Sequence, residues 1–211
     1  KGNTWIAFEH DTLRVAGAWT GQGFIDWRGI NFDGGHVVRP RTIGDPLFQT
    51  ADGPGWANPE TGSFDDQRFV GMDGRHFGPL PQKWARYEGL HQRNGKIAIA
   101  YRVGKTKILE SHKLLENGNI ARILNVGKSK KDLTLRLANE GATVRVSGNR
   151  KIKISNRDGF AIATIPANVT PLNLVFVFGE SKGNLASNEL DLSPLTQAGS
   201  ALSPTRIESP I

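Results

Sequence analysis

The side chains best suited to binding a ligand are concentrated in one stretch, residues 17–81, in which glycine recurs every few positions. Indole rings can stack on the apolar face of a sugar ring, while carboxylate, amide and guanidinium groups bind its hydroxyls. The stretch therefore predicts a binding face built from loops, with a carbohydrate as one candidate ligand. Its candidate residues are Trp19, Asp26, Trp27, Arg28, Asn31, Asp33, Trp56, Asn58, Glu60, Asp65, Asp66 and Arg75.

The tryptophans also have a structural interpretation. Trp19, Trp27, Trp56 and Trp84 can pack the loops onto the scaffold as a small satellite core. The residue pattern supports a stacking face and a satellite core equally, and one stretch can contain both.

The carboxylates of this stretch raise two further possibilities. A glycan-active enzyme needs two carboxylates facing each other roughly 5–10 Å apart. Asp65 and Asp66 are adjacent and would point to opposite faces of an extended chain, so the second carboxylate would have to come from another part of residues 17–81. Calcium needs six to eight oxygen ligands. Side chains that could supply such oxygens are Asp52, Asn58, Glu60, Asp65, Asp66 and Asp73. The spacing of these residues matches no known calcium-binding loop, so none of them is assigned as a metal ligand.

Other chemically suggestive residues have simpler interpretations. Glu9, His10 and Asp11 contain the side chains of acid–base catalysis, but a polar hairpin turn is the favoured interpretation. His36 and His76 lie beside glycine or an aromatic residue and are expected to be structural. The chain contains no nucleophile elbow, phosphate-binding glycine loop or dinucleotide-binding fingerprint.

Composition excludes several classes of site and partner. The 211 residues include no cysteine, which excludes disulfides, thiolate metal sites, thiol nucleophiles and a c-type haem attachment within the chain. Residues 1–80 carry 7 Lys/Arg and 10 Asp/Glu, whereas residues 81–211 carry 20 and 10. The basic excess falls in short runs typical of loop tips and solvated strand faces, so nucleic acid is not an expected partner. No apolar run approaches the ~20 residues of a membrane span.

The elements that must position the candidate residues are strands. Residues 4–16 alternate as two short strands around a turn at residues 10–11, and residues 24–34, if extended, place Trp27, Asn31 and Asp33 on one side. From residue 84 onward, alternating apolar segments are separated by turns, including a strong hairpin signal at Asn94-Gly95. We expect an all-β fold, an antiparallel, super-sandwich-like β-sandwich over residues 1–195 with its loop-built face at 17–81. Residues 187–195 predict a helical turn, and 196–211 predict a linker or tail.

Four runs resemble an uncharacterised bacterial family: WTGQGFIDWRGINFDG, ADGPGWANPETGSFDD, DGRHFGPLP and YRVGKTKILE. The resemblance is strongest over residues 11–110. The family is an N-terminal β domain of large secreted proteins that often continue into a β-propeller similar to quinoprotein dehydrogenases and carry a c-type cytochrome module. The resemblance implies a periplasmic or extracellular location, with any haem or quinone cofactor in the associated domains.

These observations lead to one expectation and two alternatives. We expect a non-catalytic binding or docking domain of a secreted multidomain redox protein, with a carbohydrate or a neighbouring propeller or cytochrome domain as partner. The first alternative is a glycan-active enzyme that uses two carboxylates of residues 17–81. The second is a purely structural interface between domains.

Overall fold

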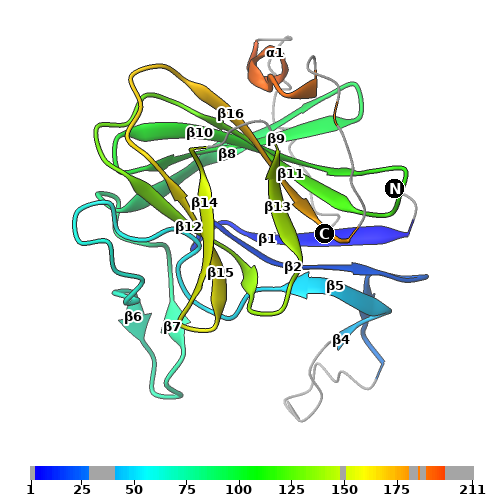
Figure 1. Ribbon diagram of the computed structural model, residues 1–211. Coiled ribbons are helices and arrows are strands. Elements are labelled where there is room, and N and C mark those ends of the chain that lie inside the picture. Colours follow the sequence, from blue (N-terminus) through cyan, green and yellow to red (C-terminus); the bar gives the residue numbers. More distant parts are fainter. Residues whose placement is uncertain (1–2, 29–40, 148–150, 181–184, 186–188, 198–211) are drawn as a thin grey trace, which may run out of the picture.

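The computed structural model describes residues 3–28, 41–147, 151–180, 185 and 189–197. Within these residues the chain is nearly all β, as predicted from the alternating pattern (Figure 1). The elements are β1 (Thr4–Glu9), β2 (Arg14–Thr20), β3 (Ile25–Asp26), β4 (Arg41–Thr42), β5 (Asp45–Gln49), β6 (Phe69–Val70), β7 (His76–Phe77), β8 (Ala85–Arg93), β9 (Lys96–Val103), β10 (Thr106–Leu114), β11 (Ile120–Val126), β12 (Leu133–Asn139), β13 (Val144–Ser147), β14 (Lys153–Arg157), β15 (Phe160–Ile165), β16 (Leu172–Phe178) and α1 (Ser193–Thr196).

One layer of the sandwich is an antiparallel six-stranded sheet in the order β13-β16-β11-β10-β9-β8. The predicted hairpin at Asn94-Gly95 joins β8 to β9. Both turn residues have positive φ (49° and 71°), which the tight turn requires and which Asn and Gly tolerate best. Arg93 pairs with Lys96 across this turn, so the turn sets the register of the sheet edge.

The opposite layer consists of two three-stranded sheets, β1-β2-β5 and β12-β15-β14. Residues 55–57 join them. The Gly55 amide donates to the Thr12 carbonyl (2.9 Å), and the Ala57 amide donates to the Thr134 carbonyl (2.9 Å). A side chain at position 55 would meet the Leu13 carbonyl oxygen at 2.3 Å, so only glycine allows this approach.

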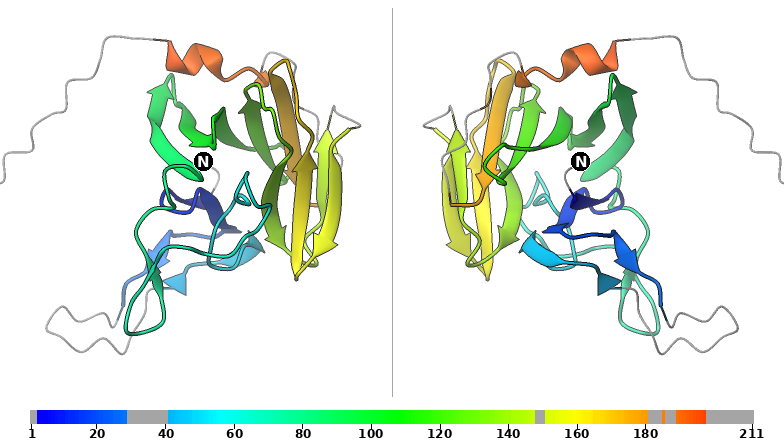
Figure 2. Two further views of the ribbon diagram at one scale, coloured as in Figure 1. Left: turned by 90° about the vertical axis from the view of Figure 1, so that its left-hand side faces the viewer. Right: turned by 90° about the vertical axis from the view of Figure 1, so that its right-hand side faces the viewer.

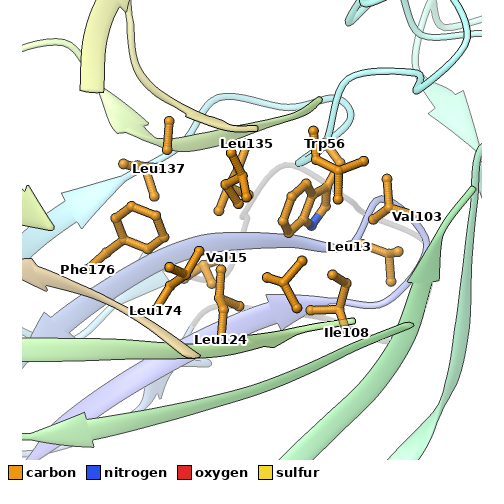
Figure 3. Packing of buried hydrophobic residues seen from close by; sticks show 14 of the residues in the cluster. Leu13, Val15, Trp56, Val103, Ile108, Leu124, Leu135, Leu137, Leu174 and Phe176 are labelled. Carbon is orange, nitrogen blue, oxygen red and sulfur yellow. The ribbon is translucent and has the colours of Figure 1, made fainter. Parts of the chain in front are cut away.

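The core lies between the two layers and is filled by alternating side chains of the six-stranded sheet. In β9, Ile99, Tyr101 and Val103 face the core, while Ala98 packs on the outer face. Figure 3 shows Trp56 inside this core, among side chains from both layers.

Part of the outer face of the six-stranded sheet is covered by residue 185 and residues 189–197. Leu192 is buried against Ile123 and Val177, and Leu190 and Leu195 pack around it. The predicted helical turn is present as α1, at the top of Figure 1. The last residue of α1, Thr196, is the first residue of the predicted linker, and residues 198–211 lie outside the described part of the chain.

Two small strand pairs project from the sandwich. β3 pairs with β4, and β6 pairs with β7, both antiparallel. Figures 1 and 2 place them at the end of the molecule opposite α1. β3 covers only Ile25–Asp26 of the predicted extended segment 24–34, and Asn31 and Asp33 fall outside the described residues.

Candidate functional site

Three of the tryptophans are buried and pack loop segments against the sandwich. Trp19, Trp56 and Trp84 are 4%, 0% and 2% exposed. The Trp19 indole N–H donates to the Phe24 carbonyl (3.2 Å) and its ring stacks on that phenylalanine, while the Trp84 indole N–H donates to the Trp56 carbonyl (3.0 Å). An open stacking face that includes Trp19 and Trp56 is therefore absent. Trp56 and Trp84 belong to the main hydrophobic core between the layers, not to a satellite core, while Trp19 packs against Phe24.

Trp27 is the predicted tryptophan that does lie at the surface, with 59% of its area exposed. It stands between Asp26 and Arg28, whose side chains form a bidentate ion pair of 2.7–3.1 Å. Hydrogen bonds from Arg28 lower the pKa of Asp26 from 3.8 to about 2. Both groups are charged at neutral pH and neutralise each other beside the exposed indole.

Asn58, Glu60 and Asp65 belong to a surface turn. The Asn58 side chain accepts from the Glu60 amide (2.9 Å), and the Asp65 amide donates to the Ser63 hydroxyl (2.9 Å). The Glu60 carboxylate pairs with Lys131 (2.5 Å), which lowers its pKa. These polar groups hold the turn together and tie it to the neighbouring loop.

Asp66 lies at the base of the β6–β7 hairpin and forms a bidentate pair with Arg68 (2.8–3.1 Å). The two side chains are 11% and 6% exposed. Burial alone would raise the pKa of Asp66, but the hydrogen bonds and charge of Arg68 outweigh it and lower that pKa. Arg68 also donates to the Gly78 carbonyl (3.4 Å), so this pair anchors both strands of the hairpin.

Arg75 lies near the tip of the same hairpin. It pairs with Asp73 (2.6 Å), and its guanidinium carbon lies 5.4 Å from the centre of the Phe77 ring. The predicted binding residues that the structure describes therefore divide among the core, the β3–β4 region, a surface turn and the β6–β7 hairpin, instead of forming one cluster.

Most of the predicted carboxylates that the structure describes are engaged by basic side chains. Asp26, Glu60, Asp66 and Asp73 are each paired with an Arg or Lys side chain, and each has a lowered pKa, whereas a glycosidase acid requires a raised one. Within the described ranges, no group of three or more His, Asp or Glu side chains is placed to hold a metal ion. No helix of these ranges is long and apolar enough to cross a membrane.

Large apolar side chains are exposed within or directly beside the projecting strand pairs and, at Leu47, in β5; together they are called the hairpin surface below. Met72, at the tip of the β6–β7 hairpin, is fully exposed, and Phe69 is 74% exposed. The hairpin surface comprises Phe24, Trp27, Ile43, Leu47, Phe69, Val70, Met72 and Phe77. Most of these residues were not selected from the sequence, because isolated apolar residues in a loop-rich stretch do not reveal which of them remain uncovered.

A pocket of about 210 Å³ opens where the β1–β2 turn meets the start of β8. His10 and Asp11 lie in the β1–β2 turn, as predicted, and Glu9 is the last residue of β1. The sequence did not predict a pocket at this turn. The lining residues come from segments far apart in the chain: His10, Asp11, Leu13, Pro79, Leu80, Gln82, Ala85, Arg86 and Tyr87.

A charged cluster lies inside the core, on strands β9, β10 and β11. The Glu110 carboxylate, fully buried, accepts from the Tyr101 hydroxyl (2.6 Å) and contacts Arg122 (2.8 and 3.0 Å) and the His112 imidazole (3.0 Å). The sequence of β10 indicates this arrangement, because Glu110 and His112 alternate with the outward-facing residues and so share a face with the core residue Ile108.

The comparisons with known proteins identify one region. A family model described as "Domain of unknown function (DUF6797)" matches residues 6–110. No curated protein and no solved structure matches the chain. The match begins within β1 and ends within β10, so it includes both projecting strand pairs, the pocket and part of the charged cluster. Residues 6–110 are thus similar to a domain family whose function is unknown.

Proposed function

We propose that this chain is a non-catalytic docking module that binds another protein domain through the hairpin surface. The observation that carries the proposal is the exposure of eight large apolar side chains, seven of them within or directly beside the two projecting strand pairs and one, Leu47, in β5. Concentrations of exposed apolar residues typically mark interaction sites, whereas apolar residues scattered singly need no explanation.

The charge of the hairpin surface favours a protein partner. Residues 24–28 and 41–47 each contain one Arg and one Asp, and residues 66–77 contain two of each. Nucleic acids and anionic membranes are bound mainly by an excess of Lys and Arg, which is lacking here. Aromatic residues, Met and Arg are the side chains enriched at protein interfaces.

The hairpin surface is also pre-organised. The Asp66–Arg68 pair fixes the base of the β6–β7 hairpin, and Phe24 packs against Trp5 and Trp19. A surface that is already ordered loses less conformational entropy on binding, so more of the contact energy contributes to affinity.

The resemblance to domains of secreted redox proteins suggests the partner's type. We propose that the partner is a β-propeller or cytochrome domain of a periplasmic or extracellular protein, and that any haem or quinone cofactor belongs to that partner. A permanent structural interface would use the same surface. A glycan-active enzyme is less well supported, because most of the predicted carboxylates that the structure describes pair with Arg or Lys.

The test places a photo-cross-linking amino acid at Phe69 or Trp27 in the intact gene product, expressed in its own host. Val169 is the matched control site, since it is 84% exposed, apolar and outside the hairpin surface. We expect both hairpin positions to cross-link to one region of a second protein domain, mapped by mass spectrometry, and Val169 to cross-link there far less.

Three results would overturn the proposal: no cross-links from the hairpin positions, yields no higher than those of Val169, or cross-links to lipid. As a second measurement, the Phe69→Ser variant should weaken the association with the mapped domain while its circular dichroism stays unchanged. The same substitution abolishing the flotation of the chain with phosphatidylcholine vesicles would identify a membrane surface instead.

A further inference from the structure

We propose that the pocket at the β1–β2 turn, called the turn pocket, binds a single neutral sugar ring. This inference is independent of the docking proposal, because none of the pocket residues belongs to the hairpin surface.

The walls of the turn pocket suit the apolar face of a pyranose. Leu13 and Leu80 are buried beneath it, and Pro79 adds a rigid apolar edge. The Tyr87 side chain, 39% exposed, supplies an aromatic wall whose ring centre lies 5.6 Å from that of His10. Sugar C–H groups pack favourably on such an aromatic face.

The polar groups suit vicinal hydroxyls. Asp11 offers a carboxylate that accepts hydrogen bonds, and Gln82 offers an amide that can both donate and accept. The His10 Nδ1 atom lies 2.9 Å from the Asp11 carboxylate, and this contact orients the imidazole so that Nε2 is the nitrogen not engaged by Asp11. A few polar groups over an apolar base are the usual make-up of a small-molecule site.

The charges select a neutral ligand over an anionic one. The cation among the lining residues, Arg86, already pairs with Glu88 (3.1 Å). The nearby Arg68 guanidinium is held by Asp66. An acidic sugar would therefore meet the Asp11 carboxylate without gaining a free cation in return.

The turn pocket is held in place from both sides. The Leu80 amide donates to the Asp11 carbonyl (2.9 Å), which ties the two walls together. Next to the turn, Thr12 and Arg14 both donate to the Glu9 carboxylate (2.8 Å each). Arg14 also donates to the Asp52 carboxylate (2.8 Å). Little reorganisation is then needed for binding.

The volume limits the ligand to one ring. At about 210 Å³, the turn pocket is smaller than the roughly 300–1,000 Å³ typical of sites for drug-sized molecules.

The test follows the ring resonances of His10 by NMR while the methyl pyranosides of glucose, galactose and mannose are added. We expect saturable shifts for at least one of them, with a Kd on the order of 1–10 mM. The methyl glucuronide, which matches the glucoside in size but carries a carboxylate, should bind at least several-fold more weakly. The resonances of His91, outside the turn pocket, should not move.

Variants locate the site. Tyr87→Ala and Asp11→Asn should each weaken binding about tenfold, and Asp11→Asn should also reduce the preference for the neutral glycoside. Tyr87→Phe keeps the aromatic wall and should bind as the wild type does. The absence of saturable shifts with every neutral glycoside would overturn the proposal, as would binding that survives both Tyr87→Ala and Asp11→Asn in folded protein. Neither outcome would affect the docking proposal.

Discussion

Glu110 and Arg122 form an ion pair that no water reaches, since both side chains are fully buried between the sandwich layers. Such a pair contributes little net stability compared with well-packed apolar residues, because both charges lose their hydration. Removing one partner is different, since the other charge is then left buried and uncompensated. Tyr101 and His112 share the carboxylate, so the pair also fixes how three neighbouring strands face the core.

We expect Glu110→Gln to lower the free energy of unfolding by about 3–5 kcal/mol, because the Arg122 guanidinium would remain buried without a counter-charge. Urea denaturation monitored by tryptophan fluorescence measures this loss. The control is Glu60→Gln, the same chemical change in an exposed ion pair, which should have little effect. Equal losses in the two variants would contradict the role assigned to the buried pair.

The same pair predicts a dependence of stability on pH. Burial alone would raise the pKa of Glu110, but Arg122 and His112 outweigh it and lower that pKa from 4.5 to about 2. Glu110 therefore stays ionised in the folded protein at pH values where it is protonated in the unfolded chain. The stabilisation by ionised Glu110 is complete above pH ~4.5 and is lost as the pH falls toward 2.

The stability advantage of the wild type over Glu110→Gln should accordingly be constant from pH 7 to about 5 and should shrink steadily between pH ~4.5 and 2. Denaturation curves of both proteins across this range test the expectation. An advantage that stayed the same at pH 3 and at pH 7 would show that Glu110 contributes nothing through its ionisation.

At the scale of elements, the β6–β7 hairpin shows how a projecting segment stays ordered. Each of its strands has only two residues, too few to be stable alone. The nearly buried Asp66–Arg68 pair and the bond from Arg68 to the Gly78 carbonyl supply the missing constraint at its base. The ion pair thus holds in place the hairpin on which Phe69 and Met72 are exposed.

Arg68→Met should loosen this hairpin without unfolding the sandwich. Loss of the guanidinium leaves Asp66 largely buried and unpaired, which we expect to accelerate amide hydrogen exchange in residues 69–77 at least tenfold. Hydrogen exchange measured by mass spectrometry tests this. The control is Arg75→Met, which removes the exposed pair near the tip and should leave exchange at the base unchanged. Acceleration throughout the six-stranded sheet would mean that the pair supports the whole fold instead.

At the scale of the whole molecule, the family match and the folding unit do not coincide. The match ends at residue 110, inside β10, yet β10 pairs along its length with β11. The side chains that cover Trp56 include Leu135 of β12, which lies beyond the match. The hydrophobic core is therefore shared between the matched region and the second half of the chain.

A fragment of residues 1–114 should consequently fail to fold, although it contains the entire family match. It would lack β13, β16 and β11, half of the strands of the six-stranded sheet, and the whole β12-β15-β14 sheet. We expect a circular dichroism spectrum typical of a disordered chain and a narrow range of amide proton shifts in NMR spectra. The fragment of residues 1–197 serves as the folded control. Well-dispersed amide proton shifts and cooperative unfolding of the 1–114 fragment would show that the matched region has a core of its own.

The sequence alone determined the class of fold and most of the strands after residue 84, because alternation and turn chemistry are local properties of the backbone. The Asn94-Gly95 hairpin and the two strands around residues 10–11 were predicted for this reason. The absence of cysteine likewise needed no structure.

Only the tertiary structure decided which side chains are covered. Trp56 and Trp27 lie in similar Gly-rich sequence, yet β12 encloses the first and nothing among the described residues encloses the second. The turn pocket arises because residues 79–87 return to the β1–β2 turn, and Glu110 finds Arg122 through the pairing of β10 with β11. Burial, pockets and ion pairs depend on contacts between segments distant in the chain, which the local pattern of either segment does not specify.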